Sequence, residues 1–298
     1  MTSPYWNDIK KAHHSLAMVC REGGDIAVAW RDFEATVKRS ADDPPFNFRA
    51  ITGLLEEMGG NKTKSDIRIL DHGCGSALWL LYLLANGYRG IHGIDVGGHC
   101  DSLNRLMRDH LGLKDKRFFL YDGSKLPFDD DQFDIVFSTQ VIEHIAPDVL
   151  ENYYAEERRV LAPGGMAYHQ VPHRLVPYDS HTRTWFIHYL PRPVWLAILS
   201  AMGRDPDFAR NQLFLRWPWV HRRLARRHIG TCDDRTMARF MSLTDLSGYD
   251  GPRGLRRFVR SLLALPGVGW LGQKLLANFV MLDTISRTPT VSASNAQA

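Results

Sequence analysis

Apolar runs alternate with helix-prone segments through the middle of this chain, which predicts a sheet layered with helices. Five apolar runs have the length of buried strands: residues 67–70, 90–96, 118–121, 133–138 and 166–171. Between them, residues 78–85 contain no helix breaker and residues 149–161 are amphipathic, so both are expected to be helical. Strands that alternate with helices are typical of a parallel sheet, so we expect a doubly wound α/β fold.

The two ends of the chain differ from this core of residues 66–172. Residues 1–65 carry apolar side chains at helical spacing and are expected to form an N-terminal helical segment. After strand five we expect a helical insertion, residues 173–277, and then a closing strand, residues 278–286. Residues 287–298 are rich in Ser and Ala, which predicts a disordered tail.

The turn after the first predicted strand has the composition of a ligand-binding loop. Residues 71–77 read Asp-His-Gly-Cys-Gly-Ser-Ala, and glycines at 73 and 75 let the backbone turn sharply and approach a ligand. A dinucleotide fingerprint requires a third glycine where this chain has Leu78. The acid Asp71 also disfavours a nearby pyrophosphate, because like charges repel. The loop better suits a ligand with an ammonium group and no phosphate, such as S-adenosylmethionine.

A second acid lies at the expected distance for a ribose contact. Asp95 ends the second predicted strand, twenty residues after Gly75, where a carboxylate accepts hydrogen bonds from ribose hydroxyls in nucleotide-binding α/β domains. The alternative is an aspartate that only caps the next helix. The preceding glycine loop favours the ribose contact.

Later motifs identify a family resemblance. Residues 126–145 contain L-P-F-x-x-x-x-F-D-x-V followed by E-H-I, and residues 161–165 read L-A-P-G-G. With the glycine loop, these motifs resemble the class I S-adenosylmethionine-dependent methyltransferases over about residues 65–172. Within that family they look like the ubiquinone and menaquinone biosynthesis enzymes. Ala77 stands where the family often has a third glycine.

The resemblance implies a Rossmann-like methyltransferase sheet, S-adenosylmethionine as cofactor, and methyltransferase activity. Asp122 is then expected to accept from the adenine amine, with Gly123 leaving room for the ring. The residues expected to bind the cofactor are Asp71, Gly73, Gly75, Asp95, Val96, Asp122, Gly123 and Gln140.

Histidines near the ends of strands four and five are the candidates for catalysis. His144 follows strand four, and His173 and His181 follow strand five, with Asp179 placed to orient one of them. His144 has the alternative of a structural histidine that bonds to the neighbouring loop, because a general base is judged first on geometry. We expect no metal site, since the spacings of His173, His181 and His188 match no helical ligand pair and no cysteine is near.

Charge divides the chain into an acidic and a basic part. Up to residue 170 there are 19 basic against 25 acidic residues, and from residue 171 onward 18 against 8, with 17 of the 18 being arginine. Aromatic and basic residues alternate in residues 216–223, further basic residues follow up to residue 228, and residues 253–265 are also basic and apolar. These stretches fit solvated helix faces, peripheral membrane contact or nucleic-acid binding, in decreasing order, and the nucleic-acid signal is not strong. We expect a small-molecule or lipid-linked acceptor that is anionic.

Four scattered cysteines and the lack of an apolar leader at the N-terminus favour a cytoplasmic protein, with contact at the inner membrane face. Residues 262–282 are apolar but contain Pro266, Gln273 and Lys274, so no membrane span is expected. The alternative to an enzyme is a methyltransferase-like module without catalysis that acts through a partner. The acceptor, its reacting atom and the oligomeric state are left open.

Overall fold

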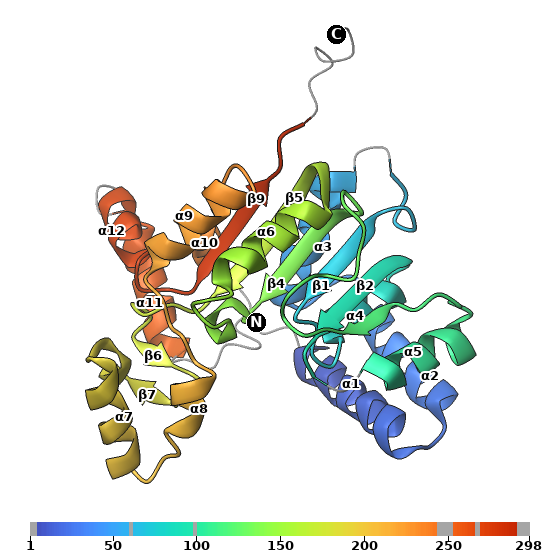
Figure 1. Ribbon diagram of the computed structural model, residues 1–298, viewed down its shortest axis with the longest axis horizontal. Helices are drawn as coiled ribbons and strands as arrows, with labels where there is room; N and C mark the ends of the chain where they lie inside the picture. Colours follow the sequence, from blue (N-terminus) through green and yellow to red (C-terminus); the bar gives the residue numbers. More distant parts are fainter. Residues whose placement is uncertain (1–4, 60–61, 98–99, 243–252, 266–268, 291–298) are drawn as a thin grey trace, which may run out of the picture.

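A seven-stranded sheet forms the centre of the protein, with strand order β3-β2-β1-β4-β5-β9-β8 (Figure 1). The structure is a computed structural model that describes residues 5–59, 62–97, 100–242, 253–265 and 269–290. β1 to β5 are parallel, whereas β9 pairs antiparallel with β5, and β8 antiparallel with β9. The strands are β1 (Arg68–His72), β2 (Gly90–Asp95), β3 (Phe118–Leu120), β4 (Phe133–Thr139), β5 (Leu161–Val171), β8 (Asp233–Asp234) and β9 (Leu282–Arg287).

Helices cover both faces of the sheet because successive side chains of each strand point to opposite sides. Ile69 and Phe137 pack into one core with the first five helices, while Leu70 and Val136 pack into another with α6 and α9. The helices on the first face are α1 (Tyr5–Glu22), α2 (Ile26–Arg39), α3 (Phe46–Gly59), α4 (Leu78–Ala85) and α5 (Cys100–Leu111). Those on the second face are α6 (Leu150–Val160) and α9 (Pro218–His228).

The segment after β5 builds a small lobe away from the sheet, seen at the lower left of Figure 1. It has its own core of Trp195, Leu199, Ala209 and Leu213. Its elements are the hairpin of β6 (Tyr178–Asp179) and β7 (Thr184–Trp185), the short helix η2 (Ile187–Tyr189), α7 (Arg192–Ala201) and α8 (Asp207–Asn211). The chain then returns to the sheet through α9, and continues as α10 (Thr236–Ser242), α11 (Arg253–Leu263) and α12 (Gly269–Leu276).

The predicted doubly wound α/β fold is confirmed, with N-terminal helices and five parallel strands in the expected order. The insertion contains helices as predicted, but it also supplies the β6–β7 hairpin and the edge strand β8. Within the described residues, no helix is long and apolar enough to cross a membrane.

The closing strand is displaced from its predicted bounds. β9 begins at Leu282, because the N–H groups of Asn278 and Phe279 still donate to carbonyls of α12. The strand runs to Arg287, and Thr288 then donates its N–H to Gly165, so the predicted tail starts too early. Residues 291–298 of that tail lie outside the described residues.

Candidate cofactor and acceptor site

The glycine loop lies between β1 and α4, at the carboxyl edge of the parallel strands. The N–H groups of Gly73 and Cys74 both donate to the Ile94 carbonyl, at 2.8 and 3.0 Å, which ties the loop to β2. Gly73 has φ +98°, and a Cβ there would overlap the methyl groups of Val141 in the loop after β4. Gly75 has φ +52° but faces open space. Gly73 is therefore required by the packing of Val141, and Gly75 leaves room beside the loop.

Asp95 connects the end of β2 to the glycine loop. Its Oδ2 accepts the N–H of Gly75 at 2.8 Å, and its Oδ1 accepts the N–H of Gly97 at 2.7 Å. A carboxylate oxygen has two lone pairs, so each oxygen retains one for a further donor. The acid therefore has a fixed orientation with acceptor capacity left over.

Asp71 is buried without a partner. The residue is 1% exposed, and neither carboxylate oxygen has a hydrogen-bond partner among the described residues. Burial, and then the charge of Asp95, raise the pKa of this carboxyl well above its ordinary value. An unpaired buried carboxylate is costly, so this position calls for a cation or a hydrogen-bond donor.

The remaining predicted cofactor residues lie at the same edge. Val96 is 71% exposed directly after Asp95, which leaves an apolar side chain without cover. Asp122 accepts the N–H of Ser124 at 2.9 Å and its hydroxyl at 2.5 Å, and these bonds lower its pKa. Gly123 has φ +85° and open space around it. Gln140 is exposed after β4 with φ +58°.

A cavity of about 260 Å³ lies beside the glycine loop. It is bounded by α1 residues, including His13 and Arg21, by Ser76 of the loop and by the start of α5. The His13 ring donates to the Ser76 carbonyl at 2.9 Å, which fixes α1 against the loop. α1 therefore covers one side of the glycine loop.

Two of the three candidate histidines meet at the ends of β4 and β5. His144 lies in the short helix η1 (Ile142–His144), and His181 lies between β6 and β7. Their rings are 5.0 Å apart between centroids. The Nε2 atoms of His181 and His144 lie 3.7 and 3.9 Å from Oε1 of Glu143. The structure thus brings together Glu143, His144 and His181, which we call the Glu143 cluster.

Both histidines of the Glu143 cluster are held through their other ring nitrogen. Nδ1 of His181 donates to Asp179 at 3.1 Å, as expected for an orienting acid, and Nδ1 of His144 donates to the Gln212 carbonyl at 2.6 Å. Burial alone lowers the pKa of His181, but its contacts with Asp179 outweigh burial and raise it. Burial lowers the pKa of His144.

Glu143 was missed as a site residue, although it stands next to His144 in the sequence. It is 1% exposed, and neither carboxylate oxygen has a hydrogen-bond partner among the described residues. Burial raises the pKa of this carboxyl to about 7. An acid adjoining a candidate histidine directly after a buried strand was the available signal.

His173, the third candidate, makes hydrogen bonds to the backbone and none to the Glu143 cluster. Its Nε2 donates to the Val280 carbonyl at 2.8 Å, and its Nδ1 accepts the N–H of Leu175 at 3.2 Å. Burial lowers its pKa to about 4. With both nitrogens engaged by the backbone, His173 has none left for proton transfer in this conformation.

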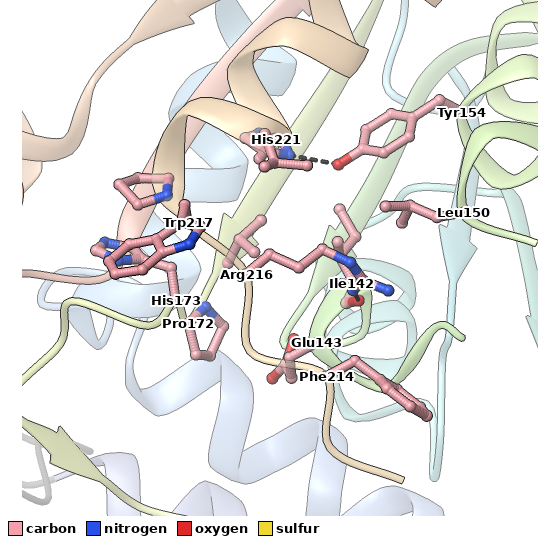
Figure 2. A pocket seen from close by; sticks show the side chains of 13 residues that line it. Ile142, Glu143, Leu150, Tyr154, Pro172, His173, Phe214, Arg216, Trp217 and His221 are labelled. Atoms are coloured by element: carbon pink, nitrogen blue, oxygen red, sulfur yellow. Dashed lines mark hydrogen bonds between the residues drawn. The ribbon is translucent and has the colours of Figure 1, made fainter. Parts of the chain in front are cut away.

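The interior behind the Glu143 cluster is closed. Figure 2 shows the side chains there, including Glu143, Phe214 and Arg216, around a cavity of about 10 Å³, roughly the volume that one water needs. Arg216 donates to the carbonyls of Ile142 and Ile145, which anchors η1. The space on this side of the cluster is therefore too small for an organic ligand.

Residues 69–165 match the family model of the methyltransferase domain. The matched segment runs from β1 into β5 and is similar to a methyltransferase domain. It is similar to sterol 24-C-methyltransferase ERG6B of Gibberella zeae, with 33% identity over 104 residues, 35% of this chain and 27% of that protein. The chain thus spans about a quarter of the length of that relative.

Two solved structures are similar over more of the chain. A putative sarcosine dimethylglycine methyltransferase from Galdieria sulphuraria is 14% identical, covers 94% of this chain and 98% of its own, and has a TM-score of 0.47. The geranyl diphosphate C-methyltransferase from Streptomyces coelicolor A3(2) is 15% identical, with coverages of 87% and 82% and a TM-score of 0.45.

S-adenosylmethionine, the predicted cofactor, fits the residues at the sheet edge. Its amino acid end carries an ammonium group, which is the partner that buried Asp71 lacks. Its ribose offers two hydroxyl donors, which suit the spare acceptor capacity of Asp95.

Proposed function

We propose that this chain is an S-adenosylmethionine-dependent methyltransferase whose acceptor binds against the Glu143 cluster. The unpartnered, buried carboxylate of Asp71 is the observation that carries the proposal, because it lies beside the glycine loop and calls for a cation or a hydrogen-bond donor, and an ammonium group is both. When bound, the cofactor would supply a methyl group on a sulfonium sulfur: the bond from the acceptor atom to the methyl carbon would form as the carbon–sulfur bond breaks, with S-adenosylhomocysteine as the leaving group. The residues of this chain have to position the two reactants and dispose of the acceptor's proton.

Each of the cofactor residues contacts a different part of S-adenosylmethionine. Asp71 pairs with the ammonium group, and the open space at Gly75 admits the methionine portion. Asp95 accepts from the ribose hydroxyls. Val96 supplies an apolar surface for adenine, whose amine donates to Asp122 beside Gly123. Gln140, the first residue beyond β4, completes the set.

The Glu143 cluster faces the acceptor. It follows β4 and β5, which are neighbours in the sheet and end at the same edge as the glycine loop. His181 is held by Asp179, so its Nε2 has a fixed direction. These groups handle the charge or the proton that the acceptor releases, and His173 supports the loop from behind.

The acceptor class follows from the basic half of the chain. We assign a small-molecule acceptor that carries negative charge and is linked to lipid, as the resemblance to the quinone-biosynthesis enzymes suggests. Arg223 and Arg226 are exposed on α9, whereas Arg222 pairs with Asp234 at 2.6 Å and is unsuitable for a lipid contact.

Exposed apolar side chains support contact with an anionic membrane surface. On α12, Trp270, Leu271 and Leu275 are 69%, 59% and 60% exposed, and Lys274 lies over the Trp270 ring at 3.9 Å. Trp217 and Trp219 stack at 5.0 Å and are 40% and 53% exposed. Aromatic side chains next to basic ones suit the interface between lipid and water.

The cofactor assignment is tested with Asp71→Asn, and Asp101→Asn on the exposed start of α5 serves as the control. Losing a charged partner worth about 1.5–3 kcal/mol weakens S-adenosylmethionine binding by about tenfold to a hundredfold. Because the unliganded protein buries this acid unpaired, the same change leaves its melting temperature unchanged or higher. Calorimetric affinity equal to the wild type, or a lowered melting temperature in the unliganded variant, contradicts the role of Asp71.

Activity is tested by transfer of labelled methyl groups to metabolite extracts, with mass spectrometry of the products. We expect product from the wild type, and none from His181→Ala, although this variant still binds S-adenosylhomocysteine. Wild-type protein that binds the cofactor but yields no product in any extract supports the alternative of a binding module without catalysis.

Membrane contact is tested by co-sedimentation with anionic and neutral vesicles at low and high salt. Binding is expected on anionic vesicles at low salt, and it should weaken in Arg223→Glu/Arg226→Glu and in Trp270→Ser. Val194→Ser, which changes an exposed side chain on α7, is the control. Equal sedimentation with both vesicle types would remove the membrane proposal and leave methyl transfer unaffected.

A further inference from the structure

The Glu143 cluster presents three ligand atoms to one point. The carboxylate of Glu143 and the free ring nitrogens of His144 and His181 all lie within 4.8 Å of one another. Oε1 of Glu143 is 3.7 Å from Nε2 of His181 and 3.9 Å from Nε2 of His144, which are too long for hydrogen bonds. Both histidines converge within ion-pair distance of Glu143, and no hydrogen bond joins either of them to it.

The orientation of the two rings is that of metal-binding histidines. Such a histidine usually donates its second N–H to a carboxylate or a backbone carbonyl, which leaves a lone pair on the nitrogen that binds the metal. His181 has Asp179 in this position at 3.1 Å, and His144 has the Gln212 carbonyl at 2.6 Å. Both bonds therefore favour a lone pair on Nε2, directed toward Glu143.

Glu143 provides independent evidence for a cation. Its side chain is fully buried, and neither oxygen finds a donor among the described residues. A carboxylate in this state is rare in folded proteins unless an ion or another unseen partner meets it. Phe208 packs against both histidine rings, 5.8 Å from His144 and 6.0 Å from His181 between centroids, so an apolar wall borders the cluster.

We infer that Glu143, His144 and His181 form a binding site for one divalent transition-metal ion of the zinc type. Ligand atoms around tetrahedral zinc are about 3.3 Å apart, given bonds of about 2.0–2.1 Å. The Glu143–histidine separations of 3.7 and 3.9 Å would therefore shorten by about half an ångström on binding, and all three ligand atoms already lie within 4.8 Å of one another. Two imidazoles and one carboxylate favour zinc, iron or nickel over magnesium, which prefers oxygen ligands.

A site with three protein ligands leaves a coordination position open, as in catalytic zinc sites. An acceptor oxygen at that position would lose its proton more easily. This second step depends on the proposed methyl transfer, whereas the binding of the ion does not. The prediction of no metal site was based on the spacing of His173, His181 and His188. The group that the structure brings together is a different one, Glu143, His144 and His181.

Titration with Co²⁺ tests the site, because its visible d–d absorption reports nitrogen and oxygen ligands directly. Protein without an affinity tag is stripped with a chelator, titrated with Co²⁺, and then challenged with Zn²⁺ or Mg²⁺. We expect one Co²⁺ per chain, displaced by Zn²⁺ and not by Mg²⁺. Glu143→Gln, His144→Ala and His181→Ala lose this binding, and Asp179→Asn weakens it about 10–100-fold. His110→Ala, at an exposed histidine of α5, leaves it unchanged.

Binding of S-adenosylhomocysteine, measured on every variant, separates this inference from the proposed function. Variants that bind S-adenosylhomocysteine normally and lose Co²⁺ support the metal site. Wild-type protein without a Co²⁺ spectrum, or ligand variants that keep it, overturns the metal site while leaving the cofactor assignment intact. If Asp95→Ala loses S-adenosylhomocysteine binding but retains Co²⁺ binding, the two sites are separate, which supports the assignment of the metal ion to the Glu143 cluster.

Discussion

Asp95→Ala is the sharpest test of where the cofactor lies. The acid is fixed by the N–H groups of Gly75 and Gly97, at 2.8 and 2.7 Å, so its two oxygens do not need to be ordered when a ligand arrives. Each hydrogen bond from a ribose hydroxyl to this carboxylate is worth about 1.5–3 kcal/mol, and two of them about 3–6 kcal/mol. At about 1.4 kcal/mol per factor of ten, removing them weakens binding by about a hundredfold to ten-thousandfold.

Calorimetric titration with S-adenosylhomocysteine measures this loss without turnover. Asp95→Asn keeps one acceptor oxygen, so its affinity should fall between those of the wild type and the alanine variant. Asp101→Ala makes the same charge change on the exposed start of α5 and should bind normally. If Asp95→Ala remains folded and its dissociation constant stays within about threefold of the wild type, the acid does not contact the ribose.

Two further changes probe the fold around the site. Gly73→Ala places a Cβ against Val141 at φ +98°, whereas Gly75→Ala meets no atom within 4 Å. Gly73→Ala should lower the unfolding free energy by about 1–3 kcal/mol more than Gly75→Ala does. Adding Val141→Ala to Gly73→Ala should recover part of this loss in urea titrations, and equal losses in the two glycine variants would contradict the packing argument. Glu157 is buried between His72 and His169, at 3.1 and 2.8 Å. Burial alone raises its pKa, but the two histidines outweigh burial and lower it to about 2. Its stabilising contribution is therefore present above the ordinary value of 4.5 and is lost as the pH falls toward 2. The stability gap between wild type and Glu157→Gln should narrow on acidification, and a constant gap would refute this.

The parallel core could be predicted from the sequence because its strands are buried on both faces. Such strands appear as continuous apolar runs, and β4, with six of its seven residues buried, is the clearest example. β8 gave no such signal, since it consists of two exposed aspartates whose pairing with β9 depends on tertiary structure alone. The start of β9 was misplaced for a related reason: residues 278–281 are as apolar as a strand, and only the end of α12 excludes them.

The cofactor residues could be predicted because the glycine loop and the acid after β2 have a fixed spacing in this fold. The acceptor residues could not, because they come from loops whose positions depend on long-range contacts. His173 and His181 are eight residues apart and looked equivalent. The turn at Asp179 directs His181 toward Glu143, while the Val280 carbonyl engages His173. The motif E-H-I was considered for its histidine, and the burial of its acid was not visible in the sequence.

Asp71 and Glu143 are two buried acids at the same edge of the sheet, and both need a partner that the protein itself does not provide among the described residues. Each follows or ends a buried strand, each is 1% exposed, and neither has a hydrogen-bond partner among the described residues. A buried acid without a partner lowers the stability of the unliganded protein, so each position is costly unless a ligand meets it. The surroundings indicate different ligands. Asp71 lies beside a glycine loop and open space, which admit an organic ammonium group. Glu143 faces two imidazole nitrogens. When both rings are neutral, each offers a lone pair that can bind a metal ion. The bonds from Nδ1 to Asp179 and to the Gln212 carbonyl leave the lone pair of each neutral ring on Nε2, beside Glu143, and the two acids therefore select a cofactor and a metal ion by the groups that surround them.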